Sequence, residues 1–478
     1  MKAKSALQII ASTFTILCAN AVGQTPNLVA NNDTIITTTT RGPLFINTLL
    51  SNDTDAGNDP IKILNVGTAQ FGKTELRSGN TVAYTPGRFF TGKDSFTYRI
   101  NDRPNGSGNS ATGTVLIRNP FLIGRGIYAT SVSGEGGSHD VSGYIAANVT
   151  PSGKFTCTLR FAGDSFRFRG QFDLSGNFSG SISRHGLPSL QVALLYAING
   201  EVREITGFVT AGAQNIPFTA PKVSWSYQNT PFATGRYTFV LPAPNTAATT
   251  PQGAGFMTTY VNRNGVVITS GRTGDNLGFT SSTYLGEDDS TIPIYGRFYR
   301  ESIGTSGIFG DIALSDIASR RSVSVTGEGD LHWFVPRNPK RVRFPGGLDL
   351  TVAARGSAYN EPAPGNAVLF VPVTAGFNGQ FTASGGNIRT PRIERASVGL
   401  RPIAGPYQVA FDNSKRLKAS LIVTARNGTF GGTFFNTATR QTSRFSGVFI
   451  QGENKAYGIW TAPKRTGSVE LVPDEGAK

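Results

Sequence analysis

The sequence predicts an almost entirely β-sheet protein that is divided into several domains. The chain has 478 residues, which is too many for one ordinary core and suggests about three or four domains. Glycine is abundant, with 58 residues, whereas methionine and histidine number only 2 and 3. Plentiful glycine beside threonine, valine and phenylalanine is typical of pleated strands closed by tight turns. Beyond the N-terminal apolar run, no segment keeps the 3.6-residue period of an amphipathic helix.

The N-terminus has the pattern of a secretory signal peptide. Lys2 and Lys4 precede an apolar run over residues 7–17, and small residues follow it. The run is too short to cross a membrane as a helix. We therefore expect residues 1–23 to be removed on export, leaving a protein that is secreted or held at the cell surface and does not span the membrane.

The cysteine count excludes some kinds of site, and the net charge indicates a kind of partner. Cys18 lies in the expected signal peptide, so Cys157 would be alone in the exported chain, without a disulfide framework or a zinc site of several thiolates. Cys157 alternates with Phe155 and Leu159, which predicts a buried, unreactive thiol. The net charge of +15 becomes +13 (15 − 2) without the two signal-peptide lysines. This excess favours anionic partners and equally serves solubility.

Short alternating segments fill the first block of the exported chain. They cover residues 61–66, 81–84, 95–100 and 113–117, each bounded by Gly, Asn, Asp or Pro. Such spacing is typical of the strands of a β-sandwich. We expect one domain over residues 28–119.

The motifs of this block stand in a specific order. They are Ala30-Asn31-Asn32-Asp33, Ser51-Asn52-Asp53-Thr54-Asp55, Phe71-Gly72, Tyr84-Thr85-Pro86, Phe90-Thr91-Gly92-Lys93-Asp94-Ser95-Phe96-Thr97-Tyr98 and Asn101-Asp102. In this order the block resembles the bacterial Ig-like and cadherin-like modules that occur in tandem in large surface adhesins. The resemblance implies an Ig-like sandwich, a place at the cell surface and a role in adhesion. Such modules usually form strings, whereas this chain has one copy.

An acidic turn in this block is the strongest candidate for a metal site. Calcium takes six to eight hard oxygen ligands, and carboxylates spaced two apart in a glycine-containing turn can converge on one ion. The expected ligands are Asp33, Asp53, Asp55, Asp59 and Asp102, and the related modules carry such acids at their boundaries. The alternative is that these side chains cap turns by bonding the backbone, without any metal.

The rest of the chain carries divergent repeats. Gly126-Ile127-Tyr128 recurs as Gly235-Arg236-Tyr237, an offset of 109 (235 − 126), and Ser152-Gly153-Lys154-Phe155 recurs as Asn264-Gly265-Val266-Val267, an offset of 112 (264 − 152). A third match pairs Leu194-Leu195-Tyr196 and Gly207-Phe208 with Ile294-Tyr295 and Gly307-Ile308-Phe309. We expect three antiparallel β units, over residues 120–228, 229–319 and 320–470.

The third unit has the same glycine and aromatic texture. It includes Asn427-Gly428-Thr429-Phe430, Phe445-Ser446-Gly447-Val448-Phe449 and Tyr457-Gly458-Ile459-Trp460. These units resemble the Gly-rich β-repeat regions of large exported bacterial proteins, which have no assigned activity. The resemblance implies a location and an architecture rather than a function.

A basic segment beside aromatic residues is the clearest candidate for a ligand. Its members are Trp333, Arg337, Lys340, Arg341 and Arg343. Cations beside exposed aromatic rings can hold polyanions or stack on sugars. The alternative is a charged loop that protects an edge strand from pairing.

No arrangement of residues in the sequence supports catalysis. The acids Glu135, Glu201, Glu204, Glu328 and Asp330 are scattered among glycine-rich strands and are expected to face solvent, and His139, His185 and His332 share no metal-ligand spacing. We therefore expect a non-catalytic binding or structural protein that contacts an anionic polysaccharide or protein of the cell surface or matrix. Export argues against sequence-specific nucleic-acid binding. An exported polysaccharide-active enzyme, or its carbohydrate-binding accessory, is the alternative, and paired carboxylates in a cleft would favour it.

Overall fold

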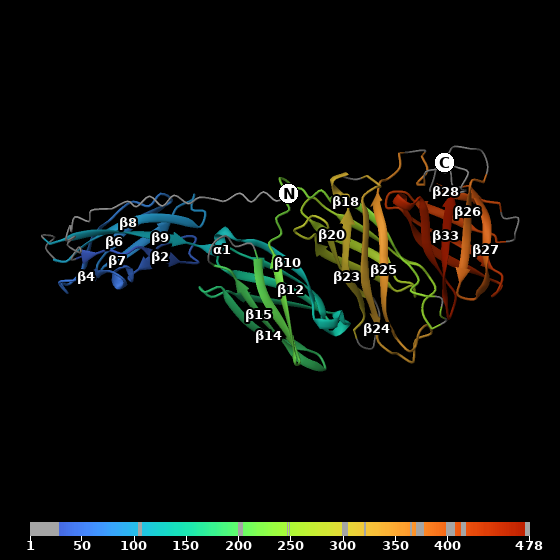
Figure 1. Cartoon of the computed structure of the whole chain (residues 1–478), viewed down its shortest axis with the longest axis horizontal. Helices are drawn as coiled ribbons and strands as arrows, with labels where there is room; N and C mark the ends of the chain where they lie inside the picture. Colours follow the sequence, from blue (N-terminus) through green and yellow to red (C-terminus); the bar gives the residue numbers. More distant parts are fainter. Residues whose placement is uncertain are drawn as a thin grey trace, which may run out of the picture. The chain divides into compact units, whose positions relative to one another are not determined.

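The computed structural model describes residues 28–103, 108–198, 204–245, 247, 249–298, 305–319, 322–363, 366–369, 377–397, 407–412 and 417–473. Strands dominate these residues, which confirms the all-β prediction. The chain divides into two compact units, Met1–Asn119 and Pro120–Lys478, of which the first is blue in Figure 1. The expected signal peptide lies outside the described residues. No helix in the described part of the chain is long and apolar enough to cross a membrane.

The first unit is a small β-sandwich. Its strands are β1 (Leu28–Val29), β2 (Asp33–Ile36), β3 (Leu44–Ile46), β4 (Thr54–Asp55), β5 (Lys62–Val66), β6 (Gly72–Arg77), β7 (Thr81–Pro86), β8 (Lys93–Asn101) and β9 (Ser110–Arg118), with a 3-10 turn at Leu49–Ser51. One sheet has the order β2-β9-β8-β5 and the other β3-β7-β6, while β1 pairs with β4. Along β8, Phe96, Tyr98 and Ile100 enter the core and the residues between them are exposed, as the alternation predicts.

The motifs of this unit form one hydrogen-bond network around a turn. Tyr84 donates its hydroxyl hydrogen to Oδ2 of Asp94 at 2.7 Å, and the backbone N–H groups of Gln70 and Phe71 donate to the same carboxylate at 3.1 Å. A Cβ atom at Gly72 would lie 2.5 Å from the Tyr84 ring, so only glycine fits there. The order of the motifs therefore reflects contacts between distant turns.

The second unit holds three successive eight-stranded bodies, each an antiparallel meander. The first body follows the short helix α1 (Pro120–Ile123) and contains β10 (Gly126–Ser133), β11 (Ser142–Val149), β12 (Lys154–Phe161), β13 (Asp164–Gln171), β14 (Asn177–Arg184), β15 (Leu187–Tyr196), β16 (Glu204–Ala211) and β17 (Gln214–Pro221), with 3-10 turns at Glu135–Gly137 and His139–Val141. Its two sheets, β10-β11-β12-β13 and β14-β15-β16-β17, share one apolar core. Cys157 lies in that core, and burial raises the pKa of its thiol to about 12, which keeps it protonated.

The second body is a closed barrel. It contains β18 (Gly235–Leu241), β19 (Gly255–Val261), β20 (Val266–Arg272), β21 (Gly278–Tyr284), β22 (Thr291–Phe298), β23 (Gly307–Ser315), β24 (Thr326–Val335) and β25 (Leu348–Tyr359), with a 3-10 turn at Ile317–Ser319. Pairing of β25 with β18 closes the barrel. The expected boundary between residues 319 and 320 is wrong, because it falls between β23 and β24, which pair with each other. Barrel closure joins strands that are far apart in sequence, and local patterns do not reveal it.

The third body is also a closed barrel. It contains β26 (Gly379–Gly385), β27 (Ile388–Ser397), β28 (Tyr407–Phe411), β29 (Ser420–Thr424), β30 (Thr429–Asn436), β31 (Gln441–Ile450), β32 (Lys455–Thr461) and β33 (Thr466–Pro473), with a 3-10 turn at Gln451–Glu453. Pairing of β26 with β33 closes it. The third body therefore begins near residue 379 rather than at residue 320.

Two of the three sequence repeats fall on equivalent strands. Gly126 and Gly235 each begin the first strand of a body, and Gly153 and Gly265 precede the third. Gly153 and Gly265 have φ angles of 75° and 70°, as a residue in a tight hairpin turn requires. The third match is wrong by one strand, because Leu195 lies on the sixth strand of its body and Tyr295 on the fifth. Strands of similar length and composition follow one another here, so a match of two strands does not fix the strand number.

Candidate functional site

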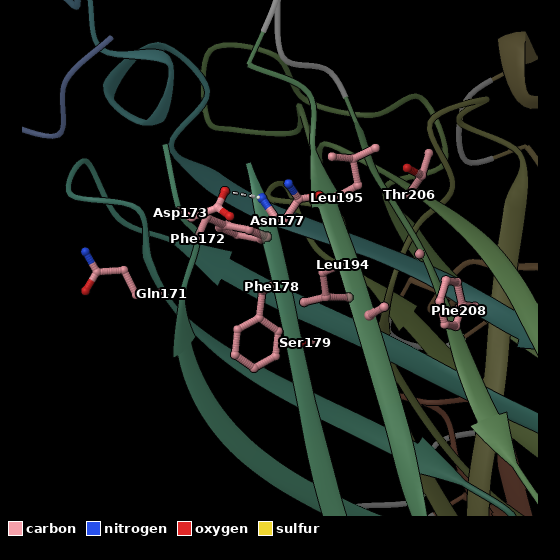
Figure 2. Close-up of a pocket in the computed structure, with 12 residues that line it drawn as sticks. Gln171, Phe172, Asp173, Asn177, Phe178, Ser179, Leu194, Leu195, Thr206 and Phe208 are labelled. Atoms are coloured by element: carbon pink, nitrogen blue, oxygen red, sulfur yellow. Dashed lines mark hydrogen bonds between the residues drawn. The ribbon is translucent and has the colours of Figure 1, made fainter. Parts of the chain in front are cut away.

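An open pocket lies on the first body. It has a volume of about 1000 Å³ and lies over β14, β15 and β16, next to the end of β13. Figure 2 shows its lining residues, which are Gln171, Phe172, Asp173, Asn177, Phe178, Ser179, Ala193, Leu194, Leu195, Thr206, Gly207 and Phe208. More apolar than polar atoms face it, so the pocket suits a partner that brings apolar surface.

The floor of the pocket is the outward face of the sheet. Leu194 is buried in the core, whereas its neighbour Leu195 is 46% exposed and Phe208 is 39% exposed. The ladder between β15 and β16 pairs Leu195 with Thr206 and Ala193 with Phe208, so these four residues share one face. Two large apolar side chains therefore lie together on a sheet surface that faces solvent.

A rigid turn forms one rim of the pocket. Oδ1 of Asp173 accepts hydrogen bonds from the backbone N–H groups of Ser175 at 2.9 Å and Asn177 at 2.8 Å, the latter visible in Figure 2. Gly176 completes the turn with a φ of 84°. Because hydrogen bonds between the Asp173 side chain and the backbone hold the turn, the rim is preformed for binding.

A smaller pocket gathers acidic residues at the joint between the first and second bodies. It has a volume of about 380 Å³, and its lining includes Asp311, Asp330, His332 and Asp349. The Ser131 hydroxyl donates to Oδ1 of Asp311 at 2.9 Å, and removal of the carboxyl group from water raises the pKa of Asp311. Asp330 is exposed as expected. Sequence reasoning did not find this group of acids, because three different strands supply them.

Both histidines at this joint serve structure. His332 contacts the Gly137 carbonyl oxygen through Nδ1 at 3.0 Å and Asp349 through Nε2. His139 is buried in the 3-10 turn His139–Val141, and its ring stacks on Phe334 with the centroids 4.4 Å apart. Burial lowers the pKa of His139.

The basic segment is divided between solvent and a joint. Arg337 and Lys340 are exposed, and Arg341 is half-buried. Arg343 donates from Nε to the carbonyl oxygen of Ala462 at 3.2 Å, which links the second and third bodies, and from Nη1 to that of Asp275 in its own body at 3.2 Å.

The prediction that Trp333 binds a ligand is wrong. Trp333 is buried in the core of the second body. Its strand, β24, alternates, and Trp333 points inward with Leu331 and Val335. Nearness in sequence to the basic loop concealed that inward position.

The five expected calcium ligands do not converge. Asp33 and Asp53 lie together at the Tyr98 hydroxyl, which donates to Asp53 Oδ1 at 2.9 Å. Asp59 donates its backbone N–H to Asp55 Oδ2 at 2.7 Å in a separate turn. Among the described residues, no three acidic, histidine or cysteine side chains are placed to hold a metal ion.

Asp102 stands apart from these two pairs. It is buried, and its Oδ2 accepts a hydrogen bond from the Asn109 side-chain amide at 2.9 Å. Most of the five acids therefore bond turns and neighbouring backbone, which was the alternative to calcium.

Comparison with known protein families identifies the N-terminal module. Residues 24–118 match the family described as a bacterial Ig domain. No curated protein and no solved structure matches the chain. The first unit is thus a bacterial Ig domain, a kind of module typical of surface and extracellular proteins, and the predicted resemblance of this block is confirmed.

Proposed function

We propose that this chain is a non-catalytic protein of the bacterial cell surface or extracellular matrix, and that it works by contact through the outward face of β14–β16. The observation that carries this proposal is the joint exposure of Leu195 and Phe208 over a pocket of about 1000 Å³. Contiguous exposed apolar surface marks interaction sites on soluble proteins. The Ig domain and the signal-peptide pattern at residues 1–23 support an extracellular location.

The chain offers a matched control for testing this site. Tyr260 and Ile268 form a cross-strand pair on the second body and are 39% and 52% exposed, close to the values for Phe208 and Leu195. We would compare the variant Leu195→Ser/Phe208→Ser with the control Tyr260→Ser/Ile268→Ser. The measurement is the distribution of each protein between the cell-envelope fraction and the medium of the producing bacterium.

The proposal expects the pocket variant to shift to the medium while the control stays with the envelope. Equal retention of both variants would contradict it. Circular dichroism would confirm that both variants keep the β-sheet fold.

Calcium binding remains a proposal for the Ig domain, restricted to Asp33 and Asp53. Burial raises the pKa of both carboxyl groups, and Oδ2 of Asp33 has no hydrogen-bond partner among the described residues. A divalent cation would offset the repulsion between two such carboxylates. The remaining acids do not fit the same ion, because they lie in other turns.

A polysaccharide-active enzyme is the second candidate function. The acidic pocket favours it, because Asp311 has a raised pKa beside Asp330 and Asp349, and glycoside hydrolysis uses a protonated and an ionised carboxyl group. Asp311→Asn should abolish release of reducing sugars from acidic polysaccharides if this function is correct. The preferred proposal expects no release from either protein.

A further inference from the structure

The three eight-stranded bodies are joined in the same way at both joints. For each body we call the outward face of the first two strands the covering face, and the outward face of the fifth to seventh strands the receiving face. At each joint the covering face of one body packs on the receiving face of the next.

The first joint sets β10 and β11 against β22 and β23. Tyr144 of β11 packs with Tyr295 of β22 and Phe309 of β23 in one buried cluster. The Tyr144 hydroxyl accepts a hydrogen bond from the backbone N–H of Tyr284 at 2.7 Å, and the Tyr295 hydroxyl accepts one from Gly163 at 2.8 Å. On the receiving face, Tyr295 and Phe309 are cross-strand partners and are only 6% and 8% exposed.

The second joint sets β18 and β19 against β31 and β32. Phe256 of β19 packs with Val448 and Ile450 of β31 and with Ile459 of β32. The Thr238 hydroxyl donates to the Phe449 carbonyl oxygen at 2.6 Å. The covering strands are again the first two of their body, whereas the receiving strands are the sixth and seventh rather than the fifth and sixth, so the two joints are offset by one strand.

Among the residues that the structure describes, this arrangement leaves one face of each kind without a packed sheet. The receiving face of the first body is the pocket on β14–β16, where Leu195 and Phe208 are exposed. The covering face of the third body is formed by β26 and β27, where Thr382 pairs with Ile393 and Ile393 is 44% exposed. On the covering face of the second body the cross-strand pair Val240 with Phe256 is buried in the second joint.

We infer that the pocket on β14–β16 receives β26 and β27 of a second copy of this chain, so that copies join head to tail. The inference rests on the proposed function, because it names the partner of the same contact surface. Both halves of the contact are present in every molecule, and the chain already uses this type of joint twice. Such a contact is heterologous and leaves a free face at each end, so further copies can add in a line.

A second copy explains the pocket better than a small ligand does. The two equivalent receiving faces are covered by β-sheet surface of this same chain, with aromatic and aliphatic side chains on both sides. The open receiving face offers the same kind of surface, with apolar side chains on the neighbouring strands β15 and β16. Glycan binding at this pocket is the outcome that would replace the inference.

The test is sedimentation velocity of the purified full chain over a range of concentrations. The wild type should show masses at whole-number multiples of the monomer. Two variants interrupt opposite halves of the contact, Leu195→Ser/Phe208→Ser on the receiving face and Ile393→Ser on the covering face. Each should raise the dissociation constant by about tenfold or more, because truncating central apolar anchors has that effect. The control Tyr260→Ser/Ile268→Ser should associate as the wild type does.

Mixing the two variants gives the sharpest result. Each mixed pair retains one intact contact, so at concentrations where either variant alone is monomeric the mixture should form dimers and nothing longer. A wild type that remains monomeric at about 100 μM, far above a typical specific dissociation constant, would overturn the inference. Association that survives both substitutions would overturn it equally.

This test separates the inference from the proposed function. If the pocket variant leaves the cell envelope but the wild type never associates, the contact surface is correct and the partner is something else, such as a glycan. If the protein associates as described but retention does not depend on the pocket, the head-to-tail contact stands and the proposed function fails.

Discussion

The receiving faces of the first and second bodies differ chiefly in what covers them. In both, two large apolar side chains lie on neighbouring strands of an outward sheet surface. Leu195 and Phe208 are 46% and 39% exposed, whereas Tyr295 and Phe309 are 6% and 8% exposed. Tyr295 and Phe309 are therefore buried by the sheet that packs on them, whereas Leu195 and Phe208 remain open to a partner.

Removing an aromatic ring from each face should give the largest difference in stability. Phe309→Ala empties a buried position at the joint and should lower the free energy of unfolding by about 3 kcal/mol. Phe208→Ala removes a ring that is already in water and should cost less than about 1 kcal/mol. Denaturation by urea at low protein concentration measures both values. Equal losses in the free energy of unfolding would show that Phe208 and Phe309 are buried to the same extent, which would contradict the difference between the two faces.

The second joint offers a similar comparison between two arginines. Arg343→Ala removes two hydrogen bonds to carbonyl oxygens and should cost about 2 kcal/mol. The exposed Arg337 lies in the same segment, and Arg337→Ala should change stability by less than about 0.5 kcal/mol. Urea denaturation measures both changes. A large loss of stability in Arg337→Ala would contradict the placement of Arg337 in solvent and of Arg343 at the second joint.

The covered face should respond to pH, because the first joint buries His139. Burial holds the pKa of His139 below its ordinary value. The charge of His332 lowers this pKa further, whereas the charges of Asp140 and Asp349 raise it. The unfolded chain therefore takes up a proton near pH 6.5, where the folded chain does not. The contribution of His139 to the free energy of unfolding is therefore fully present above about pH 6.5. It decreases as the pH is lowered, by up to about 1.4 kcal/mol at pH 5.5.

The variant His139→Gln isolates this effect from other titrating groups. Asp311 has a raised pKa, so its contribution has the opposite sign: it is present at low pH and lost as pH rises through the folded pKa. Unfolding midpoints at pH 7.5 and 5.5 should differ less in His139→Gln than in the wild type. An unchanged difference would show that His139 is not the sensitive group.

The smallest expected effect extends the comparison to the Ig domain. Asp33→Asn removes one of two neighbouring carboxylates whose pKa values are raised by burial, so it should stabilise the domain at pH 7. Calcium should raise the unfolding temperature of this domain in the wild type but not in Asp33→Asn. Calorimetry with calcium and with chelator measures both. Identical wild-type traces would remove calcium from the account.

Local alternation predicted positions within strands but not the contacts between strands. The pattern around Cys157 gave its burial correctly, and the same reasoning applied to β24 would have placed Trp333 inside the barrel. The closure of the second body depends on pairing between Arg236 and Tyr359, which no local pattern reveals. The boundary at residue 319 failed for that reason.

The candidate site was largely beyond sequence reasoning. Leu195 is one of the exposed residues of β15, which alternate with buried residues along the strand. This alternation was the one signal in the sequence that pointed to the site. Tyr295 stands on an outward face too, yet the first joint covers it. Only the packing of one body on another separates the two, so the open face could not be identified in advance.

The most direct test of the contact surface is disulfide cross-linking between copies. We would mix Phe208→Cys with Ile393→Cys, since the native Cys157 is buried and will not interfere. The account predicts a covalent dimer between the two variants, formed faster than with the control pair Tyr260→Cys and Ile393→Cys. Equal rates for the two pairs would contradict the claim that β14–β16 receives β26 and β27.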